Sequence, residues 1–354
     1  MRRIGILTGG GDCPGLNAVI RAVAKTAIHR NGMEVIGFLD GFQGLVEDRT
    51  VPLAFDDVSN ILTLGGTILG TSSKDNFFQV REYGKRQGMA IKNRLSDAKR
   101  VFKKHRLDGL ICVGGDGTLT VAHHLHRNGI PIIGVPKTID NDVRETDLSF
   151  GFNTASTIAA EAVDRLHTTA ASHHRVMILE VMGRHAGWIA LHAGIAGGGD
   201  VILIPEIPFS LQSVCQVVTQ RSQRGRRFSL IVVAEGAHPR GGSEVKTSGR
   251  LGGVGPALAG QIEKKIGIES RATVLGHLQR GGTPTPFDRI LATRFGHAAA
   301  VLAAKGGYGK MVRLKADVLS AVDLRRVAGR PRCVPLSSPL ITAARAVGTS
   351  LGRR

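Results

Sequence analysis

Three segments of the sequence place glycines and an aspartate directly after an apolar run. They are Ile4-Gly-Ile-Leu-Thr-Gly-Gly-Gly-Asp12, Leu110-Ile-Cys-Val-Gly-Gly-Asp-Gly-Thr118 and Ile130-Pro-Ile-Ile-Gly-Val-Pro-Lys-Thr-Ile-Asp-Asn-Asp142. Each apolar run is typical of a buried strand, and ligands bind at the carboxyl ends of strands in α/β sheets. Glycines let backbone N–H groups approach a phosphate, and carboxylates are ligands for Mg²⁺. The three segments together predict one site for phosphates and a divalent cation.

The aspartates of these segments have the chemistry that phosphoryl transfer to an alcohol needs. In this reaction a carboxylate takes the proton of the accepting hydroxyl, while a metal ion and cations neutralise the moving phosphate. Asp116 is placed to reach Mg²⁺, and Asp140 and Asp142 are candidates for the base. The competing interpretations are structural, because aspartates also stabilise turns and Thr118 is a suitable cap for a following helix.

Arginines bounded by glycines occur in the second half of the chain. Arg184 follows an apolar run that ends at Val181, and Arg280 follows His277 in the segment His-Leu-Gln-Arg-Gly-Gly, shortly after Arg271. The planar guanidinium group binds phosphate through paired hydrogen bonds. Solvated surface charge is the competing interpretation, and no histidine spacing typical of a metal site accompanies these arginines.

Strands and helices must alternate to position these residues. Expected strands cover residues 3–7, 34–39, 109–113, 131–135, 175–181, 201–204, 229–234 and 272–275, and expected helices cover 16–30, 118–127, 154–168, 188–196 and 211–223. Such alternation predicts parallel sheets with helices on both faces. The length of 354 residues suits two Rossmann-like three-layer α/β domains, with the active site expected in the cleft between them.

The composition narrows the class of protein. No apolar run reaches the ~18 residues of a membrane helix, and the first residues form a strand pattern rather than a signal peptide. The four cysteines, Cys13, Cys112, Cys215 and Cys333, show no paired metal spacing, which favours a cytoplasmic protein. The net charge of +19 suits anionic substrates or a solvated surface. A nucleic-acid-binding role rests on this charge alone, without an aromatic platform or reading motif.

Five motifs occur together and in order. They are Gly10-Gly-Asp-Cys-Pro-Gly-Leu-Asn17, Gly114-Gly-Asp-Gly-Thr118, Pro136-Lys-Thr-Ile-Asp-Asn-Asp142, Glu180-Val-Met-Gly-Arg184 and Leu275-Gly-His-Leu-Gln-Arg-Gly-Gly282. With these motifs the chain closely resembles the phosphofructokinase A family of 6-phosphofructokinases, from residue 1 to about residue 310. The resemblance implies an enzyme that phosphorylates fructose 6-phosphate at its 1-hydroxyl with Mg²⁺ and ATP.

The resemblance also implies roles for individual residues. Asp140 would be the base, assisted by Asp142, and Asp116 would bind Mg²⁺. Thr138 would contact the sugar and the transferred phosphate. The phosphate donor would be bound by Gly11, Ser73, Lys74, Gly115, Asp116, Gly117, Thr118 and Lys137. The sugar would be held by Met182, Gly183, Arg184 and Glu235, and its 6-phosphate by His277 and Arg280. Arg175 and Arg271 would reach that phosphate from a neighbouring subunit, which implies a homo-oligomer, usually a tetramer.

Two departures from the family pattern leave alternatives open. Ser73 stands where an arginine is usual, so a non-catalytic sugar-phosphate-binding regulatory homologue is one alternative. Pyrophosphate-using members carry Asp and Lys where this chain has Gly117 and Lys137, whereas ATP-using members carry Gly at both positions. The signature is therefore mixed, and a pyrophosphate-dependent phosphotransferase is the second alternative. We expect ATP, because Gly117 leaves space for the α-phosphate of a nucleotide.

The expected domains follow from the resemblance and the strand pattern. Residues 1–151 with 279–329 would bind the phosphate donor, and residues 152–278 would bind the sugar phosphate. Residues 330–354 are expected to be a C-terminal segment with a partly disordered tail, because they are small, basic and contain glycine.

Overall fold

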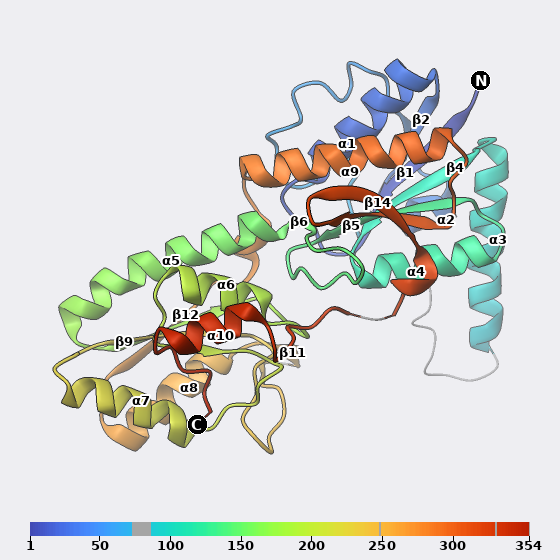
Figure 1. The fold of residues 1–354 in the computed structure, drawn as a ribbon. Coiled ribbons are helices and arrows are strands. Elements are labelled where there is room, and N and C mark those ends of the chain that lie inside the picture. The colour runs from blue at the N-terminus through green and yellow to red at the C-terminus, as the bar shows by residue number, and fades with distance from the viewer. Residues whose placement is uncertain (73–85, 248, 330, 354) are drawn as a thin grey trace. The chain divides into compact units, whose positions relative to one another are not determined.

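The computed structural model describes residues 1–72, 86–247, 249–329 and 331–353, which form two compact units, each with its own sheet (Figure 1). The first unit contains Met1–Ile139, Val143–Asn153 and Arg280–Pro331. The second contains Asp140–Asp142, Thr154–Gln279 and Arg332–Arg354. The predicted α/β class with two sheet-based domains is confirmed.

The sheet of the first unit has the strand order β14-β13-β5-β4-β1-β2-β3, with β6 paired to β5. The strands are β1 (Arg3–Thr8), β2 (Glu34–Phe38), β3 (Thr50–Pro52), β4 (Gly109–Gly114), β5 (Ile132–Thr138), β6 (Phe150–Gly151), β13 (Lys310–Lys315) and β14 (Val318–Asp323). The edge strands β3 and β14 are antiparallel to their neighbours, unlike the parallel arrangement expected. Only Ala316 and Asp317, both with positive φ, join β13 to β14, and a link of two residues permits a hairpin but no parallel crossover.

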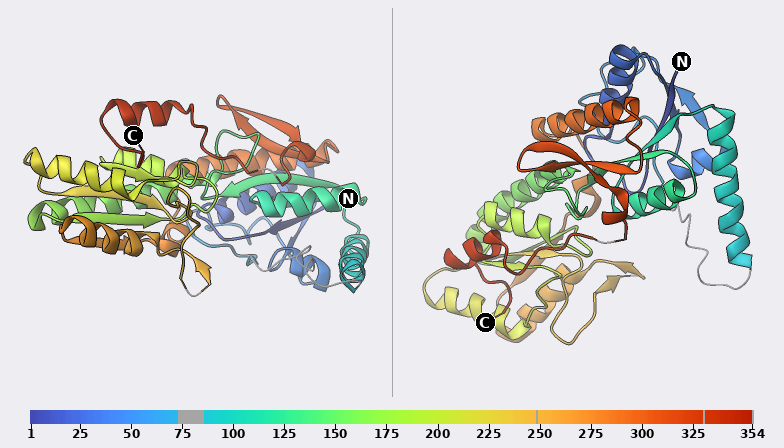
Figure 2. Two further views of the ribbon diagram at one scale, coloured as in Figure 1. Left: turned by 90° about the horizontal axis from the view of Figure 1, so that it is seen from below. Right: turned by 45° about the vertical axis from the view of Figure 1, so that its right-hand side comes forward.

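Helices cover both faces of this sheet (Figures 1 and 2). They are α1 (Leu16–Lys25), α2 (Phe42–Glu47), α3 (Arg86–Lys104), α4 (Asp116–Arg127) and α9 (Pro286–Ala304). Helices α1 and α9 lie side by side, and Gly296 permits this, since a Cβ atom there would lie 2.7 Å from that of Ala22. On the other face α2, α3 and α4 pack into a core with Leu7, Leu110 and Ile132. Alternate strand residues therefore serve alternate faces, as expected for a sheet covered on both sides.

The second unit has a parallel sheet of order β12-β7-β9-β8 and a separate two-stranded ribbon. Its strands are β7 (Val176–Val181), β8 (Val201–Leu203), β9 (Ser229–Ala234) and β12 (Ser270–Val274), with β10 (Lys246–Thr247) and β11 (Arg250–Leu251) in the ribbon. Its helices are α5 (Phe152–His173), α6 (Trp188–Ala196), α7 (Leu211–Gln223), α8 (Val254–Ile266) and α10 (Pro339–Ala346). Helices α7 and α8 pack with Ile178 and Ile231 in one core.

Several element boundaries differ from those expected, and two of the differences change the kind of structure assigned. The helix expected over residues 16–30 is α-helical only to Lys25 and continues as a π-helix over Thr26–Arg30. The strand expected to end at residue 135 extends to Thr138, because Lys137 and Thr138 pair with Phe150 and Gly151 of β6. These two residues therefore lie in a strand rather than in the loop that follows it.

The C-terminal segment is more ordered than we expected from its composition. It forms α10, and Ser350 then pairs with the edge of β8, donating its N–H to Asp200 O at 2.9 Å and accepting from Ile202 N at 2.9 Å. Ile341 and Leu351 are at most 2% exposed. The expectation of a partly disordered tail is thus wrong for residues 331–353, because a few apolar side chains and an open strand edge order a segment that is mostly small and basic.

Helix α5 is the longest described helix, with 22 residues, but it carries Glu161, Asp164 and Arg165. None of the helices in the described ranges combines the length and apolar character needed to cross a membrane.

Candidate active site

The strand ends of the three glycine-aspartate segments meet at one edge of the first unit's sheet. Strands β5, β4 and β1 are neighbours and parallel, so their carboxyl ends lie together. The register pairs Thr8 with Val113 and Gly114 with Pro136. Gly9 N donates to Val113 O at 2.9 Å, which joins the first segment directly to the second. The structure therefore brings Gly11, Asp116 and Lys137 to the same sheet edge, as the sequence pattern predicts.

Thr118 fills the space between the ends of β1 and β4. It is only 7% exposed, and a Cβ atom at Gly9 would lie 2.9 Å from its side chain. A Cβ atom at Gly114 would lie 2.2 Å from the Cβ of Thr118. The glycines on either side therefore make room for this side chain, which has a packing function in addition to any contact with a phosphate.

Two cations hold the backbone of the glycine loop at residues 9–12. Lys137 is 3% exposed, and its ammonium group donates a hydrogen bond to Gly11 O. Arg280 Nη1 donates to Asp12 O at 3.0 Å, and a Cβ atom at Gly11 would lie 2.7 Å from the same nitrogen. Arg280, expected at the sugar 6-phosphate, thus lies against the loop expected to bind the donor. The sequence carries no local signal of this contact, because it joins residues 268 positions apart.

The amino terminus of α4 presents the donor-side residues Asp116 and Gly117. Gly115 is the N-cap residue and supplies no side chain, so the first N–H groups of the helix are not capped by their own N-cap side chain. Gly117 is exposed, and outside its own helix turn a Cβ atom there would meet no atom of the described residues within 4 Å. The first N–H groups of a helix and the helix dipole favour an anion at such an end. The space in front of Gly117 is therefore open to a phosphate chain.

The residues here fit a magnesium ion carried on phosphates. Within the described ranges, no group of three or more His, Cys, Asp or Glu side chains is arranged to hold a metal ion by itself. Mg²⁺ usually keeps several waters and binds through one or two carboxylates together with substrate phosphates. The half-buried Asp116, in the first turn of α4, supplies one such carboxylate.

Asp140 and Asp142 lie in the second unit, directly after the end of β5 in the sequence. Both are half-buried, and Asn141 between them is 2% exposed and has φ 51°. Arg332 N donates to Asp142 O at 2.7 Å, and Arg332 O accepts from Trp188 Nε1 at 3.0 Å. The backbone beside the candidate base is therefore held by a residue from the C-terminal segment, which the sequence motifs do not assign to the site.

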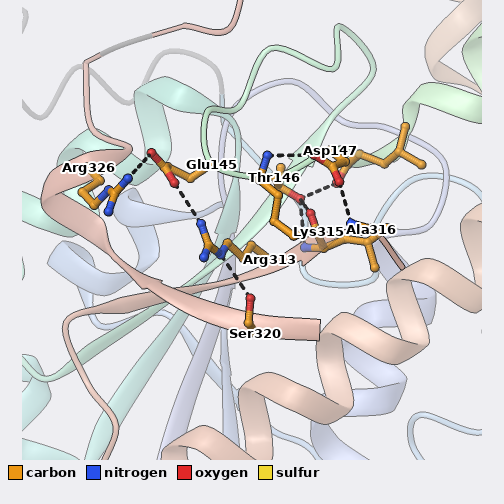
Figure 3. A network of polar contacts seen from close by, with 10 residues as sticks. Glu145, Thr146, Asp147, Arg313, Lys315, Ala316, Ser320 and Arg326 are labelled. Carbon is orange, nitrogen blue, oxygen red and sulfur yellow. Dashed lines mark hydrogen bonds and ion pairs between the residues drawn. The ribbon is translucent and has the colours of Figure 1, made fainter. Parts of the chain in front are cut away.

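The chain that continues from this segment is anchored in the first unit by the β13–β14 hairpin (Figure 3). Glu145 forms ion pairs with Arg313 at 2.9 Å and with Arg326 at 3.0 Å. Asp147 forms an ion pair with Lys315 at 2.7 Å. Figure 3 shows these acids turned toward the hairpin, in a network that also contains Thr146 and Ser320. The network fixes the path of the chain three to five residues beyond Asp142.

The expected sugar-binding residues Gly183 and Glu235 meet at the carboxyl edge of the second unit's sheet. Gly183 N donates to Glu235 Oε1 at 3.4 Å, and Gly236 N donates to Gly183 O at 3.1 Å. Gly183 has φ 139°, and a Cβ atom there would lie 2.7 Å from Ala186 O, so only glycine fits. Of the other residues expected to bind the sugar, Met182 is half-buried and Arg184 is exposed, and His277, expected at its 6-phosphate, is also exposed.

Glu180 opens the motif that ends at Arg184, but its side chain points into the protein. It is 2% exposed and accepts hydrogen bonds from Gly253 N at 2.9 Å and Gly255 N at 2.8 Å. Gly253 is the N-cap residue of α8, so the carboxylate caps that helix and complements its dipole. We infer a structural role for Glu180, which a motif comparison alone does not separate from substrate binding.

Arg175 and Arg271 lie at the opposite edge of this sheet from Gly183 and Glu235. Arg175 immediately precedes β7, and Arg271 is the second residue of β12, so both stand at the amino ends of their strands. Both form ion pairs with the same carboxylate: Arg175 Nε lies 2.7 Å from Glu269 Oε2, and Arg271 Nη2 lies 2.6 Å from Glu269 Oε1. Within this unit they are therefore separated from the other expected sugar-binding residues. Ser73 and Lys74, expected at the donor, lie outside the described residues.

The sequence matches the family model of phosphofructokinase over residues 3–303. A protein of Chloroflexus aurantiacus named ATP-dependent 6-phosphofructokinase is 52% identical over 353 residues, which are 99% of this chain and 98% of that protein. A protein of Amycolatopsis methanolica named pyrophosphate–fructose 6-phosphate 1-phosphotransferase is 50% identical over 341 residues, which are 94% of this chain and 96% of that protein.

Solved structures show the same likeness. The phosphofructokinase of Saccharomyces cerevisiae is similar with a TM-score of 0.79 and 30% identity over 92% of this chain. This chain spans 45% of the length of the yeast chain. The pyrophosphate-dependent phosphofructokinase of Marinobacter aquaeolei is similar with a TM-score of 0.81 and 25% identity, over 99% of this chain and 88% of that chain.

Proposed function

Because this chain belongs to the phosphofructokinase family, we propose that it is an ATP-dependent 6-phosphofructokinase acting in the cytoplasm. It transfers the γ-phosphoryl group of ATP to the 1-hydroxyl of fructose 6-phosphate. The bond from the sugar oxygen to the γ-phosphorus forms, and the bond from that phosphorus to the β,γ-bridging oxygen breaks. ADP leaves, and the hydroxyl proton passes to a carboxylate.

The observation that carries the choice of ATP is the open space before Gly117. Apart from its own helix turn, no atom of the described residues lies within 4 Å of a Cβ position there, at a helix amino terminus that favours anions. A chain of three phosphates with a nucleoside needs this room, whereas pyrophosphate needs less. Gly11, Gly115 and Thr118 line the same sheet edge, and Lys137 holds the loop that would face the donor.

Asp140 is the proposed base, and Asp142 assists it. A carboxylate within hydrogen-bond reach of the 1-hydroxyl removes its proton as the phosphoryl group arrives, which typically contributes 10²–10⁴-fold to the rate. Arg332 holds the backbone at Asp142, and this limits the movement of the segment that carries the base. Thr138, at the end of β5, contacts the sugar and the transferred phosphate in this proposal.

Asp116 is the residue proposed to hold Mg²⁺ together with the donor phosphates. When bound, the ion would neutralise part of the negative charge on the phosphates. Cationic side chains share this task, and Arg184 is proposed to contact the transferred group from the carboxyl edge of the second unit's sheet.

The sugar phosphate is assigned to Met182, Gly183, Arg184 and Glu235, with His277 and Arg280 at its 6-phosphate. Arg175 and Arg271 are assigned to the 6-phosphate of a neighbouring subunit, which makes the enzyme a homo-oligomer, a homotetramer in our proposal. Their place at the amino ends of β7 and β12, away from Gly183 and Glu235, supports this assignment. Arg280 supports both substrates in this proposal, since it also holds Asp12 O.

The test is a matrix of donors and acceptors on the purified full-length protein. We expect kcat/KM for ATP with fructose 6-phosphate to exceed that for pyrophosphate, and other sugar phosphates to react more slowly. Turnover with pyrophosphate alone would overturn the choice of donor. Binding of fructose 6-phosphate without turnover by either donor would support a regulatory homologue instead.

Pyrophosphate is the second candidate donor because Lys137 occurs at the position where pyrophosphate-using members carry lysine. The relative from Amycolatopsis methanolica, named for pyrophosphate, is 50% identical. Lys137 is nevertheless buried and bonded to Gly11 O, which gives it a function in the loop whatever the donor is. The same matrix of substrates separates the two candidates.

A further inference from the structure

A polar cavity of about 410 Å³ lies in the first unit, at the opposite end of α4 from Asp116. Its walls come from the last turns of α4 and from the open end of the β13–β14 hairpin. The charged and histidine side chains that line it are His123, His126, Arg127, Lys310, Asp323 and Arg325. None of them is assigned to the phosphoryl-transfer reaction, and the volume is within the ~300–1,000 Å³ range typical of small-molecule sites.

The charge of the cavity is unbalanced. Arg127, Lys310 and Arg325 are cations, and Asp323 is the only carboxylate among the described residues that line it. Asp323 lies directly across the hairpin from Lys310 and 3.5 Å from Arg325 Nη2. Across the described part of the chain, no ion pair involves Arg127 or Lys310. A net charge of about two positive units therefore surrounds this concave surface, on side chains that solvent and a dissolved anion can reach.

Two histidines complete the wall. His126 is fixed, because its Nδ1 lies 3.3 Å from Ile130 O and a Cβ atom at Gly309 would lie 2.5 Å from its Nε2. His123 Nδ1 is buried and has no hydrogen-bond partner among the described residues. Burial lowers the pKa of His123, Arg127 lowers it further, and Asp323 opposes them.

We propose that this cavity binds a phosphate group, either as inorganic phosphate or as part of a small phosphomonoester. Arg127, Lys310 and Arg325 come from three different elements, so they can approach three sides of a tetrahedral anion. A phosphate dianion matches the excess charge, whereas a single carboxylate is planar and carries half of it. The carboxyl-terminal dipole of α4 opposes an anion here, but it is weaker than the full charges of the side chains.

The test uses calorimetric titration of the full-length protein with inorganic phosphate and, separately, with glycerol 3-phosphate. Sugar phosphates and nucleotides are left out, because their phosphate groups would compete for the cavity, and the binding that remains in a variant of the cavity measures the proposed catalytic site. We expect the double variant Arg127→Gln/Lys310→Gln to bind more weakly by about tenfold to a hundredfold, because two charge-assisted hydrogen bonds are lost. Tighter binding of one probe than of the other identifies inorganic phosphate or a phosphomonoester as the ligand.

The control variant Lys103→Gln/Lys264→Gln removes two exposed lysines elsewhere and lowers the net charge equally. It should bind phosphate within about twofold of the wild type. Equal weakening in the control would overturn the proposal, because general attraction by the basic surface would then explain the binding. Wild-type protein that binds neither probe at 20 mM, about ten times a weak millimolar Kd, would also overturn it. Arg325→Gln, at a residue whose side chain is 78% exposed, repeats the comparison if the double variant unfolds.

Discussion

Replacing Gly117 with aspartate should impair the use of ATP and leave the fold intact. A Cβ atom at this position meets no atom within 4 Å in the part of the chain that the structure describes, apart from its own helix turn, and the residue lies in the first turn of α4. Glycine in a helix is about 1 kcal/mol less favourable than alanine, and an acid near a helix amino terminus gains about 0.3–1 kcal/mol. We therefore expect the melting temperature of Gly117→Asp to equal or slightly exceed that of the wild type.

The effect on ATP follows from charge. A carboxylate roughly 5 Å from a phosphate charge repels it by about 3 kcal/mol at an effective dielectric constant of ~20, and by about 1 kcal/mol at ~80. Gly117 is exposed, so the effective dielectric constant lies between ~20 and ~80. A tenfold change corresponds to about 1.4 kcal/mol. The expected loss in kcat/KM for ATP is therefore roughly 5-fold to 100-fold.

The assay measures kcat/KM for ATP and for pyrophosphate, with fructose 6-phosphate held at saturation. Pyrophosphate has no nucleoside and no third phosphate, so its efficiency should fall less than that of ATP. Gly117→Asn is the matched control, because it has the same shape without the charge. We expect Asn to retain most of the activity with ATP.

Three results would refute this reasoning. An unchanged ratio of ATP to pyrophosphate efficiency would mean that residue 117 does not select the donor. An equal loss in the Asn variant would mean that space, and not charge, decides the effect. A lower melting temperature of the Asp variant would show that the end of α4 is not open as the geometry at Gly117 indicates.

Other parts of the site lead to further predictions. Asp140→Asn should lower kcat by about 10²-fold or more at saturating substrates without changing the melting temperature, and a near wild-type kcat would exclude Asp140 as the base. Glu180→Ala leaves the N–H groups of Gly253 and Gly255 without their buried acceptor, and the free energy of unfolding in urea should fall by about 2–4 kcal/mol. Glu180→Gln should lose less, and equal losses would argue against helix capping. Burial raises the pKa of the Cys13 thiol to about 12. This thiol therefore stays protonated and hidden at pH 8, and iodoacetamide should label the exposed Cys333 first. Labelling of Cys13 at the rate of Cys333 in native protein would contradict its buried position.

Local patterns in the sequence determined the donor edge and the fold class. Apolar runs followed by glycines and aspartates mark strand ends wherever they occur, and parallel strands that are neighbours must bring these ends together. Asp116 and Gly117 could therefore be assigned to one sheet edge from their local sequence alone. The alternation of strands and helices, with motifs in a fixed order, likewise indicated the family.

Long-range contacts decided the rest. Arg280 reaches Asp12 across 268 positions, and Glu180 caps a helix that begins more than 70 residues later. The family resemblance assigns Arg175 and Arg271 to the sugar phosphate of a neighbouring subunit, and only the positions of β7 and β12 show that they lie at the opposite sheet edge from Gly183 and Glu235. The C-terminal segment is ordered by pairing with the edge of β8, which the composition of the segment does not predict. Local sequence cannot reveal such contacts, because whether a charged side chain supports the backbone or faces a substrate depends on what the rest of the chain places beside it.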